Sequence, residues 1–150
     1  MKRLIWSVIL AGALMPAARA AEAEWATDLN KALAQAKAEN KTVLVDFTGS
    51  DWCGFCIKLH KDVFQTRQFT DYAKKNLVLV EIDFPRAKAQ SEAVKRTNQQ
   101  LQDKFKVEGF PTVILLNGQG KEIGRETGYD GEGQKSYLAK IEKMRGATKK

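Results

Sequence analysis

The two cysteines of this chain, Cys53 and Cys56, are separated by two residues and follow an apolar run, 43–47, that is broken at 48–51. A strand that ends there and leads into a helical pattern places Cys53 at a helix N-terminus, where unpaired N–H groups and the helix dipole favour an anion. Such a thiol ionises readily and can act as a nucleophile near neutral pH. Cys53 would then attack a disulfide, and Cys56, one turn further on, would resolve the mixed disulfide. The spacing predicts thiol–disulfide chemistry.

A metal site is the alternative use of such a pair. The nearest further ligand is His60, the single histidine of the sequence. A tetrahedral zinc or copper site built from these three residues lacks a fourth side chain, so we expect no metal and no cofactor. His60 lies a full helical turn beyond Cys56, and we expect a partly exposed helix side chain there rather than a catalytic group.

Asp46 lies within the β-branched, apolar segment 42–48, which is typical of a buried strand. Burial without a compensating partner raises the pKa of a carboxyl group, which makes Asp46 a candidate functional residue. The alternative is an acid at a strand end that faces solvent. Trp52, immediately before Cys53, is expected to shape a docking surface beside the cysteines, the alternative being an ordinary core aromatic.

The remaining hydrophobic patterns predict a sequence of helices and strands. Helices are expected at 24–40, after the cysteines, at 65–75, and near the C-terminus up to residue 146. Strands are expected at 42–48, 77–84, 113–116 and 121–126, the last two as a hairpin. The polar segment 86–100 has helical propensity and is interpreted as an insertion or an extended helix. This order predicts an α/β fold of three layers, α/β/α, with a central mixed sheet.

The first twenty residues have the plan of a secretory signal peptide, with Lys2 and Arg3, an apolar core, and small residues that predict cleavage after Ala20. The alternative is a retained N-terminal anchor. Residues 21–150 then form a single domain, which we expect in the periplasm or outside the cell. The formal charge of +7 falls when the basic leader is removed. Because the remaining basic residues are interspersed with acids, we expect no nucleic-acid partner.

Several motifs occur in an order that resembles the thioredoxin family. They are Val45-Asp46-Phe47, Trp52-Cys53-Gly54-Phe55-Cys56, Gly109-Phe110-Pro111-Thr112 and Asn117-Gly118. The sequence is most like exported thioredoxin-like proteins in which a DFTGSDWC-type segment leads to the cysteines.

The resemblance implies roles for further residues. Asp46 would lie beneath Cys56 and accept its proton, and Phe110-Pro111 would form a cis-proline loop that faces the cysteines and binds substrate backbone. Gly128, on the next loop, would keep the substrate-binding groove beside this loop open. The sequence departs from the family in two ways: Asp46 is one residue further from Cys53, and the lysine that often accompanies the acid is absent, its matching position being assigned to Leu79.

The pair Gly54-Phe55 between the cysteines contains no histidine that could stabilise the thiolate, which favours a reductase over an oxidase. The expected partners are disulfide-containing proteins and, by resemblance, a membrane thiol–disulfide transporter as electron donor. Nothing in the sequence supplies the dimerisation domain of exported isomerases, so we expect a monomer. The alternatives are an oxidase or isomerase, and a non-enzymatic metal-binding or adaptor module on the same fold.

Overall fold

The structure, a computed structural model, describes residues 23–146. The signal peptide predicted for residues 1–20 lies outside the described residues. The elements follow the chain as β1 (Trp25–Ala26), α1 (Leu29–Glu39), β2 (Thr42–Thr48), α2 (Gly54–Leu59), a π-helical turn η1 (His60–Phe64), α3 (Arg67–Asn76), β3 (Leu77–Asp83), α4 (Glu92–Lys104), β4 (Thr112–Leu116), β5 (Glu122–Thr127) and α5 (Gln134–Gly146).

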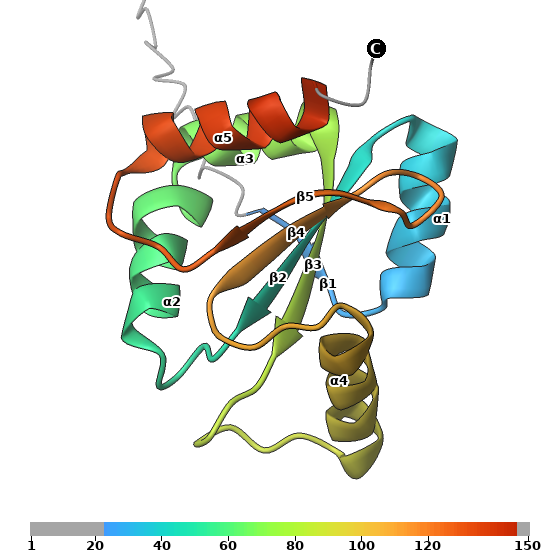
Figure 1. Cartoon of the computed structure of the whole chain (residues 1–150), viewed down its shortest axis with the longest axis vertical. Coiled ribbons are helices and arrows are strands. Elements are labelled where there is room, and N and C mark those ends of the chain that lie inside the picture. Colours follow the sequence, from blue (N-terminus) through green and yellow to red (C-terminus); the bar gives the residue numbers. More distant parts are fainter. Residues whose placement is uncertain (1–22, 147–150) are drawn as a thin grey trace, which may run out of the picture.

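The five strands form one mixed sheet in the order β1-β3-β2-β4-β5. Strands β1, β2 and β3 run parallel, whereas β4 is antiparallel to both β2 and β5. Helices α1 and α4 lie on one face of the sheet, and α2, α3 and α5 cover the other (Figure 1). The predicted α/β/α arrangement around a mixed sheet is therefore confirmed.

Strand β2 is the central strand, and its alternating side chains enter both layers of the core. Val43, Val45 and Phe47 pack on the side of α1 and α4, while Leu44 packs on the side of α2, α3 and α5. Because successive side chains of a strand point to opposite faces, Asp46 shares the face of Leu44. The buried acid and the cysteine-bearing helix α2 thus lie on the same side of the sheet.

The N-terminal helix begins later than predicted. Trp25 was expected within a helix over 24–40, but it lies in β1, opposite Leu79 of β3. The helix begins at Leu29 because Asp28 acts as its N-cap and accepts a hydrogen bond from the backbone N–H of Lys31 at 3.1 Å. The Trp25 ring packs instead against Phe64, at a centroid distance of 5.1 Å.

The segment 86–100 is helical only in its second part. Helix α4 begins at Glu92, where the Ser91 side chain caps it, and the residues between β3 and Ser91 form a loop. The predicted strands over 77–84, 113–116 and 121–126 are found as β3, β4 and β5, with ends shifted by at most one residue. Between residues 23 and 146, no helix is long and apolar enough to cross a membrane.

Candidate active site

Cys53 lies at the N-terminus of α2, as the sequence predicts. It is the N-cap residue, with an extended backbone, and its sulfur accepts a hydrogen bond from the backbone N–H of Cys56 at 3.3 Å. The preceding turn is closed by a hydrogen bond from the Cys53 N–H to the Gly49 carbonyl at 2.9 Å. A negative charge on the Cys53 sulfur would therefore be stabilised by the helix N-terminus that already donates to it.

The two cysteines form a disulfide, with their Cα atoms 5.2 Å apart. Cys53 is 7% exposed and Cys56 is 3% exposed, so the first cysteine is the more accessible of the two. The surface around them is apolar: Trp52, Phe55 and Ile57 are exposed large hydrophobic side chains. Exposed apolar side chains around the first cysteine suit the docking of another polypeptide that presents a disulfide.

Asp46 is buried, with 4% of its surface exposed, so the alternative of a solvent-facing acid is wrong. Its Oδ1 atom has no hydrogen-bond partner among residues 23–146. Burial, followed by the negative charges of Glu81 and Asp83, raises the pKa of Asp46 well above its usual value. At this raised pKa the ionised carboxylate is a stronger base than an exposed aspartate, and its proton affinity comes closer to that of a thiolate.

The residue opposite Asp46 on the neighbouring strand is Glu81, not Leu79. The parallel register of β2 and β3 pairs Asp46 with Glu81, and Leu79 lies opposite Leu44. The position opposite Asp46 thus holds an acid instead of a lysine. The negative charge of Glu81 raises the pKa of Asp46, whereas a lysine there would lower it. Burial and then Asp83 also raise the pKa of Glu81, while Lys88 lowers it.

A cavity of about 490 Å³ is lined by both Glu81 and the second cysteine. Glu81, Thr48 and Cys56 line it from within the fold. Its other lining residues come from the α2–η1 segment and from two loops, and they are Ser50, Ile57, His60, Lys61, Gln65 and Lys88. His60 therefore contributes to this wall, and its ring also lies near those of Trp25 and Phe64. The cavity gives water and protons a way to approach Cys56 from the solvent side.

The loop that carries Pro111 lies beside the cysteine loop. The Phe110–Pro111 peptide bond is cis. The ring of Phe110 meets the ring of Trp52 at a centroid distance of 6.2 Å, which connects the two loops. The carbonyl of Pro111 accepts a hydrogen bond from the N–H of Gly128 at 2.8 Å.

Gly128 has a φ of +80°, a conformation that L residues other than glycine seldom adopt. A Cβ atom at this position would meet no atom within 4 Å, so the backbone conformation rather than close packing explains the glycine. Gly128 also lines a second cavity, of about 420 Å³, together with Phe55 and Tyr129. This cavity lies beside Phe55, a residue between the two cysteines in the sequence, and neither cysteine lines it.

Trp52 is 37% exposed and held by several contacts, so it is a surface residue rather than a core aromatic. Its indole Nε1–H donates a hydrogen bond to the Phe84 carbonyl at 2.7 Å. A Cβ atom on Gly49 would lie 2.5 Å from Cε2 of Trp52, so the ring packs directly on the glycine backbone.

Sequence reasoning missed the loop that follows β3. The carboxylate of Asp51 accepts hydrogen bonds from the backbone N–H groups of Arg86, Ala87 and Lys88, at 2.9, 2.8 and 3.1 Å. The Phe84 ring stacks on Phe110 at 5.0 Å. Pro85 directly follows the predicted strand 77–84, and nothing in the sequence indicates that the loop after it returns to the cysteines.

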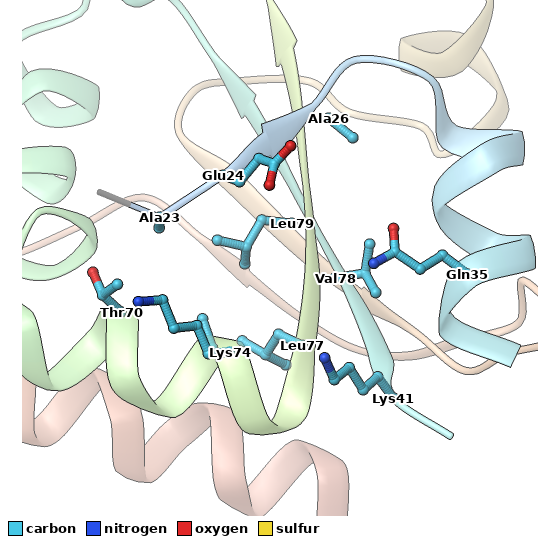
Figure 2. Close-up of a pocket in the computed structure, with 11 residues that line it drawn as sticks. Ala23, Glu24, Ala26, Gln35, Lys41, Thr70, Lys74, Leu77, Val78 and Leu79 are labelled. Carbon is cyan, nitrogen blue, oxygen red and sulfur yellow. The ribbon is translucent and has the colours of Figure 1, made fainter. Parts of the chain in front are cut away.

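A cavity of about 430 Å³ at the edge of the sheet is separate from this site (Figure 2). It lies between β1, β3, α1 and α3, and Lys41, Lys74 and Leu77 are among its lining residues. Leu77 begins β3, whereas the cysteines follow the opposite, C-terminal ends of the parallel strands. We assign this cavity no part in the chemistry of the cysteines.

Comparison with known proteins defines the class. A family model described as a thioredoxin-like domain matches residues 29–144, and the chain belongs to this family. It is 35% identical over 122 residues to the disulfide bond reductase DsbH of Chlamydia pneumoniae, which covers 81% of this chain and 72% of that protein. The solved structure of a DsbH oxidoreductase is similar with a TM-score of 0.76 and 33% identity, covering 92% of this chain and 94% of that chain.

A further relative is much longer. The chain is 38% identical over 104 residues to the thiol:disulfide interchange protein DsbD of Pseudoalteromonas atlantica, an alignment that covers 68% of this chain and 16% of that protein. Together with the disulfide at the start of α2, these relatives make the chain a thiol–disulfide oxidoreductase.

Proposed function

We propose that this protein reduces disulfides of exported proteins through the Cys53–Cys56 dithiol. The observation that carries the dithiol chemistry is the position of Cys53, which lies at the helix N-terminus and accepts a hydrogen bond there from the Cys56 N–H. The reducing direction rests on the residues between the cysteines. The uncharged pair Gly54-Phe55 adds no cation that would make the disulfide strongly oxidising. A relative that covers most of this chain is named a disulfide bond reductase, which supports the same direction.

The reaction proceeds in two exchanges. The thiolate of Cys53 attacks one sulfur of the substrate disulfide, forms a mixed disulfide, and expels the other substrate sulfur as a thiolate that takes up a proton. Cys56 then loses its proton to the Asp46 carboxylate and attacks the Cys53 sulfur. This step forms the Cys53–Cys56 disulfide and releases the second substrate thiolate, so two electrons pass from the protein to the substrate.

The groups around the cysteines hold the substrate. Trp52 and Phe110 offer aromatic surface, and the loop of Pro111, tied to Gly128, offers backbone groups to an extended chain. We place the protein in the periplasm or outside the cell as a monomer, after removal of the leader near Ala20. There a membrane thiol–disulfide transporter would return the two electrons to the Cys53–Cys56 pair.

Trapping with single-cysteine variants tests the assigned roles. Cys56→Ala removes the resolving thiol, so mixed disulfides with substrate proteins should accumulate through Cys53. Cys53→Ala is the matched variant and should trap far less, because Cys56 is the more buried sulfur. Greater trapping by Cys53→Ala would show that the order of the two cysteines is reversed.

A non-enzymatic module on the same fold is the competing function. An insulin-reduction assay with dithiothreitol, run beside zinc and copper titrations of the reduced protein, separates the two. We expect catalysed insulin precipitation that is lost in Cys53→Ala. Tight metal binding without any acceleration of insulin reduction would overturn the reductase assignment.

A further inference from the structure

The loop between β3 and α4 is fastened to the residues that precede Cys53. Asp51 accepts hydrogen bonds from three successive backbone N–H groups of this loop, those of residues 86–88. The Trp52 indole donates to the Phe84 carbonyl at 2.7 Å. These contacts join segments that are more than thirty residues apart in the sequence and give the loop a fixed position at the active site.

The loop places two cations beside the cysteines. The Arg86 guanidinium lies over the Trp52 ring, 3.8 Å from its centroid, in a cation–π contact. The Lys88 amine donates to the Ser50 hydroxyl at 3.2 Å and lines the cavity that Cys56 also lines. Lys61, from η1, lines the same cavity. We call Arg86, Lys88 and Lys61 the cationic rim.

The acids near the rim accept hydrogen bonds from other groups or lie inside the cavity, and the charge of Lys88 lowers the pKa of both Asp51 and Glu81. The carboxylate of Asp51 is occupied by the three N–H groups, and that of Asp83 accepts from the Ser50 N–H and hydroxyl at 2.9 and 2.6 Å. Glu81 lies inside the cavity and is half-buried. Among residues 23–146, none of the three rim cations forms an ion pair with an acid. Within the described part of the chain, none of the three rim cations is thus held in an ion pair, and the charge of Lys88 is offset in part by Asp51 and Glu81.

We infer that the cationic rim selects, among disulfide-bearing polypeptides, those with an aspartate or glutamate beside the reactive cysteine. The inference rests on the proposed reductase function and adds a preference in substrate charge. Trp52 and Phe55 offer apolar contact at the cysteines, and the rim adds positive charge at the edge of that surface. Complementary charge at an interface raises the association rate and discriminates against partners of like charge.

A pair of synthetic peptides tests this selection. Each peptide is closed by one disulfide, and the two differ in a single position next to one cysteine, glutamate in one and lysine in the other. The fully reduced protein should reduce the glutamate peptide about 5- to 10-fold faster at low salt. In about 1 M salt, where exposed charges are screened, the two rates should converge.

Reversing the charge of one rim residue tests whether the rim causes the difference between the two rates. Arg86→Glu should bring the ratio of the two rates to about one or below, because an acid then faces the peptide. Lys75→Glu is the matched control: it makes the same charge change at an exposed residue near the end of α3, at the other end of the sheet, and should keep the wild-type ratio (Figure 1).

The outcomes distinguish the preference for acidic peptides from the proposed reductase function on which it rests. Equal rates for the two peptides with the wild-type protein, or a preference that survives in Arg86→Glu, would overturn the selecting role while the reductase function stands. If the reduced protein reacted with neither peptide, the proposed function itself would fail, and the inference with it.

Discussion

Asp46 and Glu81 lie directly opposite each other on the neighbouring parallel strands β2 and β3. Their side chains belong to the face of the sheet that α2 covers, and Glu81 lines the cavity that also reaches Cys56. Two carboxyl groups in this arrangement disfavour each other's ionisation. Asp46 therefore has a raised pKa for two reasons, its burial first and the acids Glu81 and Asp83 second.

Replacing Glu81 should change the pH dependence of the second exchange. In Glu81→Gln, one of the negative charges that raise the pKa of Asp46 is lost, so Asp46 ionises at lower pH. The rate at which Cys56 resolves a preformed mixed disulfide should then reach its plateau at lower pH, with a larger shift in Glu81→Lys. Stopped-flow measurement of this step across the pH range tests the expectation.

Two variants serve as controls for that profile. Glu39→Gln changes an exposed acid at the end of α1 and should leave the profile where it is in the wild type. Asp46→Asn should slow resolution by about 100-fold, because the proposed proton acceptor is removed. If Glu81→Gln left the midpoint unchanged, Glu81 would not influence the proton transfer.

The buried carboxyl of Asp46 should also make the stability of the oxidised protein depend on pH. The native state holds this proton more tightly than the unfolded state does, so stability is greatest below the unfolded-state pKa, about 4, and falls as pH rises towards the raised native pKa. Relative to Asp46→Asn, the wild type should lose up to about 1.4 kcal/mol per pH unit in this window. Urea unfolding at several pH values measures the free energy of unfolding of both proteins. If this free energy depended on pH in the same way in both, the raised pKa of Asp46 would be contradicted.

Gly49 should tolerate no side chain. A Cβ atom there would lie 2.5 Å from the Trp52 ring, so Gly49→Ala must displace the indole from its hydrogen bond to Phe84. We expect a loss of about 1–3 kcal/mol in the free energy of unfolding, as for other overpacked sites, and a change in tryptophan fluorescence. Gly146→Ala, where a Cβ would meet nothing within 4 Å, is the control. Equal stability of the two variants would show that the ring adjusts without cost.

Local patterns were sufficient to predict the centre of the fold. The β-branched run 42–48 was assigned to a strand with the bounds that the structure gives β2, because its residues favour a buried strand wherever it pairs. Cys53 was placed at a helix start because the turn residues before it end the strand. Trp25 was misassigned because its spacing to Leu29 and Leu33 fits a helix, whereas the Asp28 cap and pairing with β3 decide its conformation.

Features that depend on distant contacts could not be predicted in this way. The assignment of Leu79 opposite Asp46 was wrong by two residues, because strand register is set by packing of the whole sheet and not by either strand alone. The attachment of the Arg86 loop to Asp51 joins residues 35 apart, and neither segment has a motif that indicates the other.

The reduction potential of the Cys53–Cys56 pair tests the proposed direction of electron flow most directly. The measurement is the equilibrium between the oxidised and reduced protein in glutathione buffers of defined ratio, followed by the change in tryptophan fluorescence. With the uncharged Gly54-Phe55 pair between the cysteines, we expect a potential of about −180 to −270 mV, the reducing half of the family range. A potential near about −120 mV, as in a strong oxidant, would contradict the assignment as a reductase.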